Sequence, residues 1–518
     1  MNPSRTIDQD NPQGAPIART QIDSEPFAGL PSSHRIRRGL LALLACALLG
    51  IASRGAAGRS DSAPSFINDV APILQQHCCA CHDARKRAGK LDVTTFAKLR
   101  NGGVHGDPIV PGKPEESLLV ERLRATDGRR MPPPAKDRPD DPAGALPPNQ
   151  REVIEKWIAA GAPLDPELTP DVEILRELRK RWRPPAPPER YPRPVPIVAL
   201  AFSPDGQRLV AGGLHELTLW DAKTGGLLGR LRTRAERSFS LAFISPTQLA
   251  AAGGRPGQDG DVRIYDLAAP PRAIVDGIAC WDGVEDPHTL IAHLDDGDDC
   301  FLAVAVSTDR QRLAAGGCDR SLRLWSITGG AAPSKLEQSV ELHADWILAL
   351  AFTPDGRYLL SGSRDKTAKV WDLARRESTA TFGEHQHPVY AVASRPDGKS
   401  AVSAGGDRRL RYWQFEPTIS AIKTIGGHED EILRLAASPA QPLVVTASMD
   451  QSVRVWTTDG AAVRTLGTLS APVYSLAISP DGSRVAAGSA AGEIRIWSLH
   501  DGATLASFLA APGLAARP

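Results

Sequence analysis

Residues 347–371 read ILALAFTPDGRYLLSGSRDKTAKVW, and this stretch decides the fold of most of the chain. Apolar residues alternate with other residues on both sides of a Pro-Asp-Gly turn, which predicts two short antiparallel strands. Segments of the same pattern begin at Ile197 and at Val473, so the unit is repeated along the chain. An aromatic residue ends each copy: Trp220, Tyr265, Trp325, Trp371, Trp413, Trp456 and Trp497.

The spacing of these aromatic residues indicates the architecture. Successive intervals are 45, 60, 46, 42, 43 and 41 residues. Four-stranded units that repeat every ~40–45 residues are typical of β-propellers. Residues 197–510 therefore resemble a WD-repeat β-propeller. Seven units predict a closed ring of seven four-stranded blades, with the last strand ending near residues 503–509.

Three of the repeats share four side chains at matching positions. An aspartate lies six residues before the tryptophan, a serine or threonine lies four residues before that aspartate, and a histidine lies upstream. Protease triads use the same residue types, but three copies at the repeat spacing favour a structural role. The set resembles the hydrogen-bonded tetrad of WD-repeat blades. Its members are His343, Ser361, Asp365 and Trp371; His385, Ser403, Asp407 and Trp413; and His428, Thr446, Asp450 and Trp456.

One repeat is longer than the others, because 60 residues separate Tyr265 from Trp325. We place the excess in residues 280–300, which carry seven carboxylates. The acidic stretch 282–299 is interpreted as a solvated loop on one face of the ring. A cation site and a docking loop for a basic partner are the alternatives. Cys280 and Cys300 bracket this loop, and a disulfide between them is an option in an oxidising compartment.

A second motif lies far upstream, where Cys78, Cys81 and His82 form the pattern C-x-x-C-H. This pattern predicts attachment of a c-type haem, with both thiols bonded to the porphyrin and the imidazole bound to the iron. A zinc site needs a second pair of Cys or His ligands, and a redox C-x-x-C normally lies near a βαβ pattern. Neither is present. Cys79 adds a competing thiol, and the register with His82 favours Cys78.

Met131 is the candidate for the sixth haem ligand. It is the only methionine between Met1 and Met449, and its neighbours are Arg130 and Pro132 rather than an apolar stripe. A stiff proline-rich loop suits the presentation of a thioether to iron. A surface methionine is the alternative, in which case His77 or His105 is the next candidate ligand.

Further motifs follow the C-x-x-C-H pattern: PGKPEESLL at 111–119, RMPP at 130–133 and WIAAGA at 157–162. In this combination, residues 65–165 resemble the small c-type cytochrome domains common in planctomycete proteins. The resemblance implies a covalent haem c on Cys78 and Cys81, and it supports Met131 as the axial ligand opposite His82. We expect a helix over 150–160 capped by Asn149. An N-terminal helix carrying Phe66, Val70, Ile73 and Leu74 completes the expected core.

The remaining segments precede, connect or follow these domains. We expect a cytochrome domain at 61–165, a helix (170–182) and proline-rich linker within 166–196, and a tail at 511–518. Residues 1–60 form a disordered N-terminus apart from the apolar run 39–52, which follows basic residues. This run resembles a signal peptide or an uncleaved single membrane anchor. Both alternatives place the rest of the chain in the periplasm or cell envelope.

The charge balance removes one class of function. Lysine and arginine total 61 and aspartate and glutamate total 60, so the formal net charge is +1. Nucleic-acid binders usually carry a basic surplus, and we therefore expect no nucleic-acid partner. The chain has one long apolar run, which excludes a multi-span membrane protein.

Together these patterns predict a multidomain protein, with a small all-α c-type cytochrome domain followed by an all-β seven-bladed WD-repeat propeller. We expect electron transfer or redox sensing, with the propeller as the docking platform for a protein partner. The alternative is an envelope scaffold with a structural haem. A haem enzyme ranks last, because Met131 would fill the coordination position that a substrate needs. Basic residues near both ligand segments predict a redox partner with an acidic docking face: Arg85, Lys86, Arg87, Arg129 and Arg130.

Overall fold

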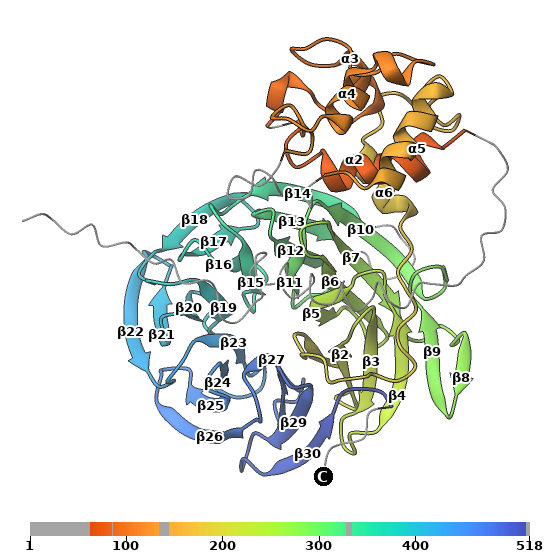
Figure 1. Cartoon of the computed structure of the whole chain (residues 1–518). Helices are drawn as coiled ribbons and strands as arrows, with labels where there is room; N and C mark the ends of the chain where they lie inside the picture. Colours follow the sequence, from red (N-terminus) through yellow and green to blue (C-terminus); the bar gives the residue numbers. More distant parts are fainter. Residues whose placement is uncertain (1–62, 85, 134–144, 328–333, 514–518) are drawn as a thin grey trace, which may run out of the picture. The chain divides into compact units, whose positions relative to one another are not determined.

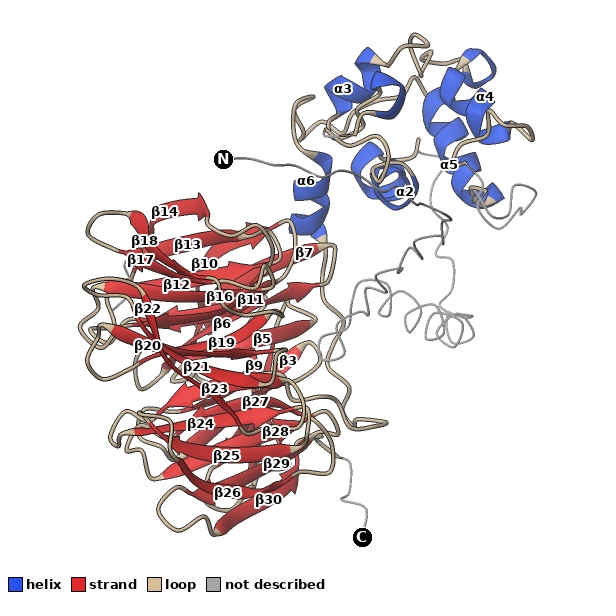
Figure 2. Ribbon diagram, turned by 90° about the vertical axis from the view of Figure 1, so that its left-hand side faces the viewer, coloured by secondary structure: helices blue, strands red, loops and turns tan. Residues whose placement is uncertain are grey.

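The computed structural model of the 518-residue chain describes residues 63–84, 86–133, 145–327 and 334–513. The expected N-terminal disorder and the apolar run 39–52 lie outside these ranges, as does the tail from residue 514. Within the described ranges, no helix combines the length and apolar character needed to cross a membrane. Helices occupy the part up to residue 181 and strands the part from residue 200 (Figures 1 and 2).

The helical part is built around one hydrophobic core. Phe66 and Trp157 are fully buried, with ring centroids 5.4 Å apart, and Phe96 meets Phe66 edge-on at 5.0 Å. Such pairs stabilise a core beyond the area they bury. The predicted apolar stripe from Phe66 to Leu74 belongs to this core. The elements are η1 (Phe66–Val70), α2 (Ala71–His77), η2 (Ala88–Lys90), α3 (Phe96–Asn101), η3 (Pro114–Glu116), α4 (Leu118–Arg124), α5 (Pro148–Ala159) and α6 (Ile174–Arg181).

Two helix boundaries differ from the prediction. Asn149 does not cap the predicted helix, because α5 begins at Pro148 and its N-cap is Pro147. Proline is favoured in the first turn, where its fixed φ is helical and its missing N–H has no partner to lose. The linker helix α6 begins at Ile174 rather than at residue 170. Residues 170–172 form a turn, in which Val172 donates its N–H to the carbonyl of Thr169 at 3.1 Å, and Glu173 forms a β-bridge with Thr95 directly before the helix.

The strands form seven sheets around a ring, as predicted, and the first strand of each blade lies at the centre (Figure 1). The first three blades are β1 (Leu200–Phe202), β2 (Arg208–Gly212), β3 (Glu216–Asp221) and β4 (Leu227–Arg232); β5 (Arg237–Phe243), β6 (Gln248–Arg255), β7 (Asp259–Asp266) and β10 (Leu290–Gly297); and β11 (Phe301–Val306), β12 (Arg312–Gly317), β13 (Ser321–Ser326) and β14 (Lys335–Glu341).

The last four blades follow the same order. They are β15 (Ile347–Phe352), β16 (Tyr358–Ser363), β17 (Ala368–Asp372) and β18 (Glu377–Phe382); β19 (Val389–Ser394), β20 (Ser400–Gly405), β21 (Arg409–Gln414) and β22 (Ser420–Gly426); β23 (Ile432–Ala437), β24 (Leu443–Ser448), β25 (Ser452–Thr457) and β26 (Ala462–Thr468); and β27 (Val473–Ile478), β28 (Arg484–Ser489), β29 (Glu493–Ser498) and β30 (Thr504–Leu509). Each of these blades is made of consecutive strands.

The extra residues of the long repeat form a hairpin that lies mostly upstream of residues 280–300, where the sequence analysis placed the excess, and the acidic stretch 282–299 is not one solvated loop. Strands β8 (Ala273–Val275) and β9 (Ile278–Asp282) lie between β7 and β10 in the sequence, and β9 pairs in parallel with β4 of the first blade. The first sheet therefore has six strands. Gly229 of β4 permits this pairing, because a Cβ atom there would overlap the ring of Trp281. The second half of the acidic stretch is β10, the outer strand of blade two.

Carboxylates of the acidic stretch have partners within the chain. Asp282 is buried and pairs with Arg272 at 2.6 Å, and Asp298 pairs with Arg179 at 2.6 Å. Two of the acidic side chains thus neutralise arginines of the same protein. Cys280 and Cys300 are free thiols, and they donate to two different carbonyl groups. The structure therefore does not form the Cys280–Cys300 disulfide.

The predicted contacts of histidine with aspartate and with serine or threonine are present in blades four to six. The tryptophan completes the tetrad in blades five and six, where Trp413 and Trp456 donate Nε1–H to Ser403 and Thr446. In blade four, the Nδ1 atom of His343 lies 2.8 Å from Asp365 and its Nε2 atom lies 2.8 Å from the hydroxyl of Ser361. The same two contacts recur around His385 and His428. All three histidines are buried. These residues tie strands together inside each blade, and a protease role is not needed to account for them.

Candidate haem site

The C-x-x-C-H motif forms a tight turn at the end of α2. Cys78 caps α2, and its N–H donates to the carbonyl of Leu74. Cys81 and His82 both donate their N–H groups to the carbonyl of Cys78, at 3.1 and 3.0 Å. Local backbone hydrogen bonds therefore bring the two predicted thiols and the imidazole onto one turn.

The three thiols of the motif differ in how far they are exposed to solvent. Cys79 belongs to the hydrophobic core and is 8% exposed, whereas Cys78 is half-buried and Cys81 is exposed. Burial raises the pKa of Cys79 to about 11 and that of Cys78 to about 12. Burial therefore distinguishes Cys81 as the exposed thiol, and the C-x-x-C-H register rather than burial favours Cys78 over Cys79 as its partner.

Two histidines next to these thiols hold buried ring nitrogens. The Nδ1 atom of His82 and the Nε2 atom of His77 have no hydrogen-bond partner among the described residues. A buried polar atom without a partner is costly and calls for an explanation. The orphaned atom of His82 is Nδ1, which leaves its other ring nitrogen, Nε2, as the atom that could bind an iron. With two thiols on the same turn, the residues around His82 fit a covalently bound haem.

Met131 lies in the segment that follows α4. Its N–H donates to the carbonyl of Arg122 at 2.9 Å, which anchors the segment to α4. The Met131 side chain is 39% exposed and is not part of the hydrophobic core. This placement agrees with the expectation that Met131 is not a core-filling residue. Its assignment as the axial ligand opposite His82 stays a prediction. His105, a fallback candidate, is exposed.

The other two motif stretches support the fold around this turn. The hydroxyl of Ser117 accepts the N–H of Val110 and donates to the carbonyl of Lys113, both at 2.9 Å. Gly112 donates its N–H to Ile158 of α5 at 2.8 Å, and its φ of 77° is readily adopted by glycine. Trp157 donates Nε1–H to the carbonyl of Pro163 at 2.9 Å. The stretches 111–119 and 157–162 therefore stabilise the fold of the helical part through these hydrogen bonds.

Sequence reasoning missed the role of Asp92. Its carboxylate is buried, accepts the N–H and the hydroxyl of Thr94 at 2.9 and 2.6 Å, and pairs with Lys98 at 3.2 Å. The next residue, Val93, donates its N–H to the carbonyl of His82 at 2.9 Å. The Asp92 turn therefore positions the segment that holds His82. The sequence signal for this turn was the Asp-x-Thr spacing of Asp92 and Thr94, which is typical of an Asx turn.

The predicted basic rim is partly neutralised. Arg129 pairs with Asp127 at 3.0 Å and with Glu121 at 3.2 Å, and Arg85 lies outside the described residues. Lys86 and Arg87 are exposed directly after the motif. Arg87 lies 3.8 Å from the Asp92 carboxylate, so part of the charge next to Cys81 and His82 is also balanced within the chain.

Comparison with known families agrees with this geometry. The family described as Planctomycete cytochrome C matches residues 78–135, which contain the motif and Met131. The family described as WD domain, G-beta repeat, matches residues 193–221, 285–326, 334–372, 376–414, 419–457 and 461–498. The chain joins a planctomycete-type cytochrome c domain to a seven-bladed WD-repeat propeller. The repeat matches skip residues 222–284, which hold most of blade two and the β8–β9 hairpin.

The cytochrome–propeller chain also resembles part of a characterised eukaryotic protein. It is 27% identical over 128 residues to the CCR4-associated factor 4 homolog of Candida glabrata. The matched segment spans 25% of this chain and 20% of that protein.

Proposed function

We propose that this chain is an exported c-type cytochrome that transfers electrons or senses redox state, with the propeller as a docking platform for its partner. The turn that joins Cys78, Cys81 and His82, inside a domain matched to a cytochrome family, carries the proposal. WD-repeat propellers are typically interaction scaffolds rather than enzymes, which supports the docking role. The basic and apolar residues at 34–52 support export.

Each site residue has a defined role in this proposal. Cys78 and Cys81 would hold haem c through thioether bonds, and His82 and Met131 would bind its iron. Bound haem supplies one-electron chemistry. Cys79 anchors the turn in the core, and the Asp92 network positions the main chain at His82. Exposed Lys86 and Arg87 would steer a redox partner with an acidic docking face.

Haem attachment can be tested on the full chain expressed with haem-maturation proteins. We expect the haem to remain with the protein through acid–acetone extraction. Replacing both Cys78 and Cys81 by serine should release it, whereas the control Cys79→Ala should retain it. A wild-type chain that stays colourless beside a correctly matured control cytochrome contradicts the proposal.

A reductive titration separates an electron carrier from a scaffold with a structural haem. We expect the haem spectrum to change reversibly with one electron per chain. A haem that is covalently attached but cannot be reduced and reoxidised supports the scaffold instead. Fractionation of cells that express the tagged chain tests export, and recovery in the cytoplasm contradicts it.

A further inference from the structure

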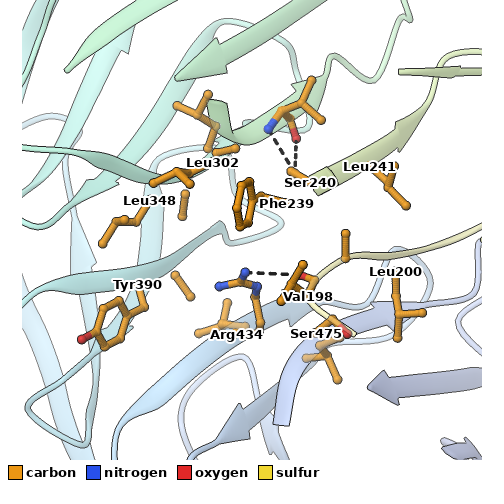
Figure 3. A pocket seen from close by; sticks show the side chains of 18 of the residues that line it. Val198, Leu200, Phe239, Ser240, Leu241, Leu302, Leu348, Tyr390, Arg434 and Ser475 are labelled. Atoms are coloured by element: carbon orange, nitrogen blue, oxygen red, sulfur yellow. Dashed lines mark hydrogen bonds between the residues drawn. The ribbon is translucent and has the colours of Figure 1, made fainter. Parts of the chain in front are cut away.

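The central channel of the propeller contains a cavity of about 180 Å³. The innermost strands of the blades supply its walls (Figure 3). A single water needs roughly 10–15 Å³ of such space, so the cavity has room for a small molecule. Most side chains around it are apolar, including Leu200, Leu241, Leu302, Leu348 and Leu476.

One position of the inner strand recurs around this channel. In blades two to seven, the pairing between the first and second strands shifts register once. The position in question is the first paired residue of the inner strand after that shift. Ala199 holds the same place in blade one, where its carbonyl accepts the N–H of Gly212. Six blades carry a small residue there: Ala199, Ser240, Ala303, Ala349, Ala391 and Ser475. Blade six carries Arg434.

Arg434 therefore projects a full positive charge among small and apolar side chains. Its Nη1 atom donates to the carbonyl of Leu433 at 2.9 Å and its Nη2 atom lies 3.5 Å from the carbonyl of Val198 (Figure 3). Burial lowers the pKa of Arg434 to about 10, so the guanidinium stays charged at neutral pH. Among the described residues that line the cavity, none is an aspartate or glutamate.

The carboxylate closest in sequence is already engaged. Glu431 interacts with the hydroxyl of Tyr390, and Arg434 is not among the groups that shift the pKa of Glu431. Arg434 is only partly exposed to solvent, and a charge that has lost part of its water shell is stabilised when an opposite charge joins it. The two carbonyl contacts use part of the donor capacity of the guanidinium, which has five N–H groups. Donors thus remain for an anion in the cavity.

We propose that this cavity binds a small organic anion whose carboxylate pairs with Arg434 and whose apolar part packs against the leucines. A guanidinium can bind a carboxylate through two parallel hydrogen bonds. One arginine balances one negative charge, which favours a monocarboxylate over a phosphate dianion. The leucine side chains favour a ligand with a small hydrocarbon part. This site is separate from the haem turn and does not depend on the proposed electron transfer.

The test uses the full chain in a buffer free of carboxylates and phosphate, with acetate, isobutyrate and inorganic phosphate as probes. Titration calorimetry should show binding of isobutyrate in preference to phosphate. Isobutyrate should also raise the unfolding midpoint of the propeller. Arg434→Ala should weaken isobutyrate binding by about tenfold or more, because charge-assisted hydrogen bonds are lost.

Two variants act as controls. Arg409→Ala removes the same charge from an exposed position on β21 and should bind isobutyrate like the wild type. Arg434→Lys keeps the charge but loses the guanidinium that can donate two parallel hydrogen bonds, so it should bind isobutyrate with intermediate affinity. Arg434→Ala is expected to fold, because alanine holds the equivalent position in four other blades: Ala199, Ala303, Ala349 and Ala391.

Three results overturn the proposal. One is unchanged isobutyrate affinity in Arg434→Ala. Another is the failure of both carboxylates to bind the folded wild-type chain. The third is tighter binding of phosphate than of isobutyrate, which would contradict the carboxylate class. A higher unfolding midpoint of Arg434→Ala without added anion supports the proposal, since it shows that the buried charge is costly when unpaired.

Discussion

Trp413 donates its Nε1–H to the hydroxyl of Ser403 across 3.1 Å. The same hydroxyl lies 2.7 Å from Nε2 of His385, whose Nδ1 atom lies 3.0 Å from Asp407. The carboxylate can only accept at neutral pH, so the Nδ1 atom of His385 carries the hydrogen of its contact with Asp407. Because these residues are buried, the linked hydrogen bonds are stronger than they would be in water.

Ser403→Ala should destabilise the propeller by about 1–3 kcal/mol, because it leaves buried groups of both Trp413 and His385 without a partner. The free energy of unfolding in urea, followed by tryptophan fluorescence of the full chain, measures this effect. Ser420→Ala, at an exposed position on β22, is the matched control and should be nearly neutral. Equal effects of the two substitutions would contradict a stabilising role for the tetrad.

The stability of blade four should depend on acid pH through Asp365. Burial alone would raise the pKa of this carboxyl, but hydrogen bonds from His343 and Thr367 outweigh it and hold the pKa well below its usual range. Asp365 therefore contributes stability fully above the unfolded-state pKa of about 3.9. This contribution is lost as pH falls through the lower folded pKa.

Asp365→Asn tests this dependence. Its free energy of unfolding should fall short of the wild-type value by a constant amount between pH 6 and 8, and the gap should narrow below about pH 4. Glu384→Gln changes an exposed carboxyl in the loop after β18 and is the control. A gap that stays constant down to the acid transition would show that ionisation of Asp365 is irrelevant to stability.

Met131→Ala should change the haem spectrum of the matured chain. Loss of the thioether would remove a soft ligand that favours ferrous iron, so the reduction potential should fall and carbon monoxide should bind more readily. Met449→Ala, in the propeller, removes the same group and should leave both properties unchanged. If Met131→Ala also changes nothing, another residue is the ligand, and His77 is the first to examine because its Nε2 atom is buried without a partner.

Oxidation of blade three should link Cys300 to Cys318 rather than to Cys280. The pairing of Phe301 with Gly317 places Cys300 opposite Cys318, and Cys318 donates its N–H to the carbonyl of Cys300 at 3.0 Å. Opposite residues in antiparallel strands have Cα atoms ~4.5–5.5 Å apart, which suits a disulfide. The two thiols would pass two electrons and two protons to an added disulfide oxidant. Peptide mapping by mass spectrometry measures the linkage, and a Cys280–Cys300 peptide would refute it.

The features that the sequence predicted correctly depend on short-range patterns. The seven blades can be predicted from alternating apolar residues, Pro-Asp-Gly turns and a period of about forty residues, because each blade repeats the same pattern of strands and turns. The contacts around His343, His385 and His428 follow from spacing within one repeat. The turn with Cys78 and His82 is also local in origin, because the N–H groups of Cys78, Cys81 and His82 donate to carbonyls three or four residues earlier.

The features that only the tertiary structure decided depend on contacts between distant residues. The stretch before Asp282 could not be assigned to a strand from its own pattern, because β9 pairs with β4 of another blade and needs Gly229 to make room for Trp281. The burial of Cys79 depends on packing with helices far along the chain. Arg434 is one arginine among many in the sequence. Its unusual position, a charge facing six small residues from other blades, arises only when the ring closes and brings all seven inner strands together.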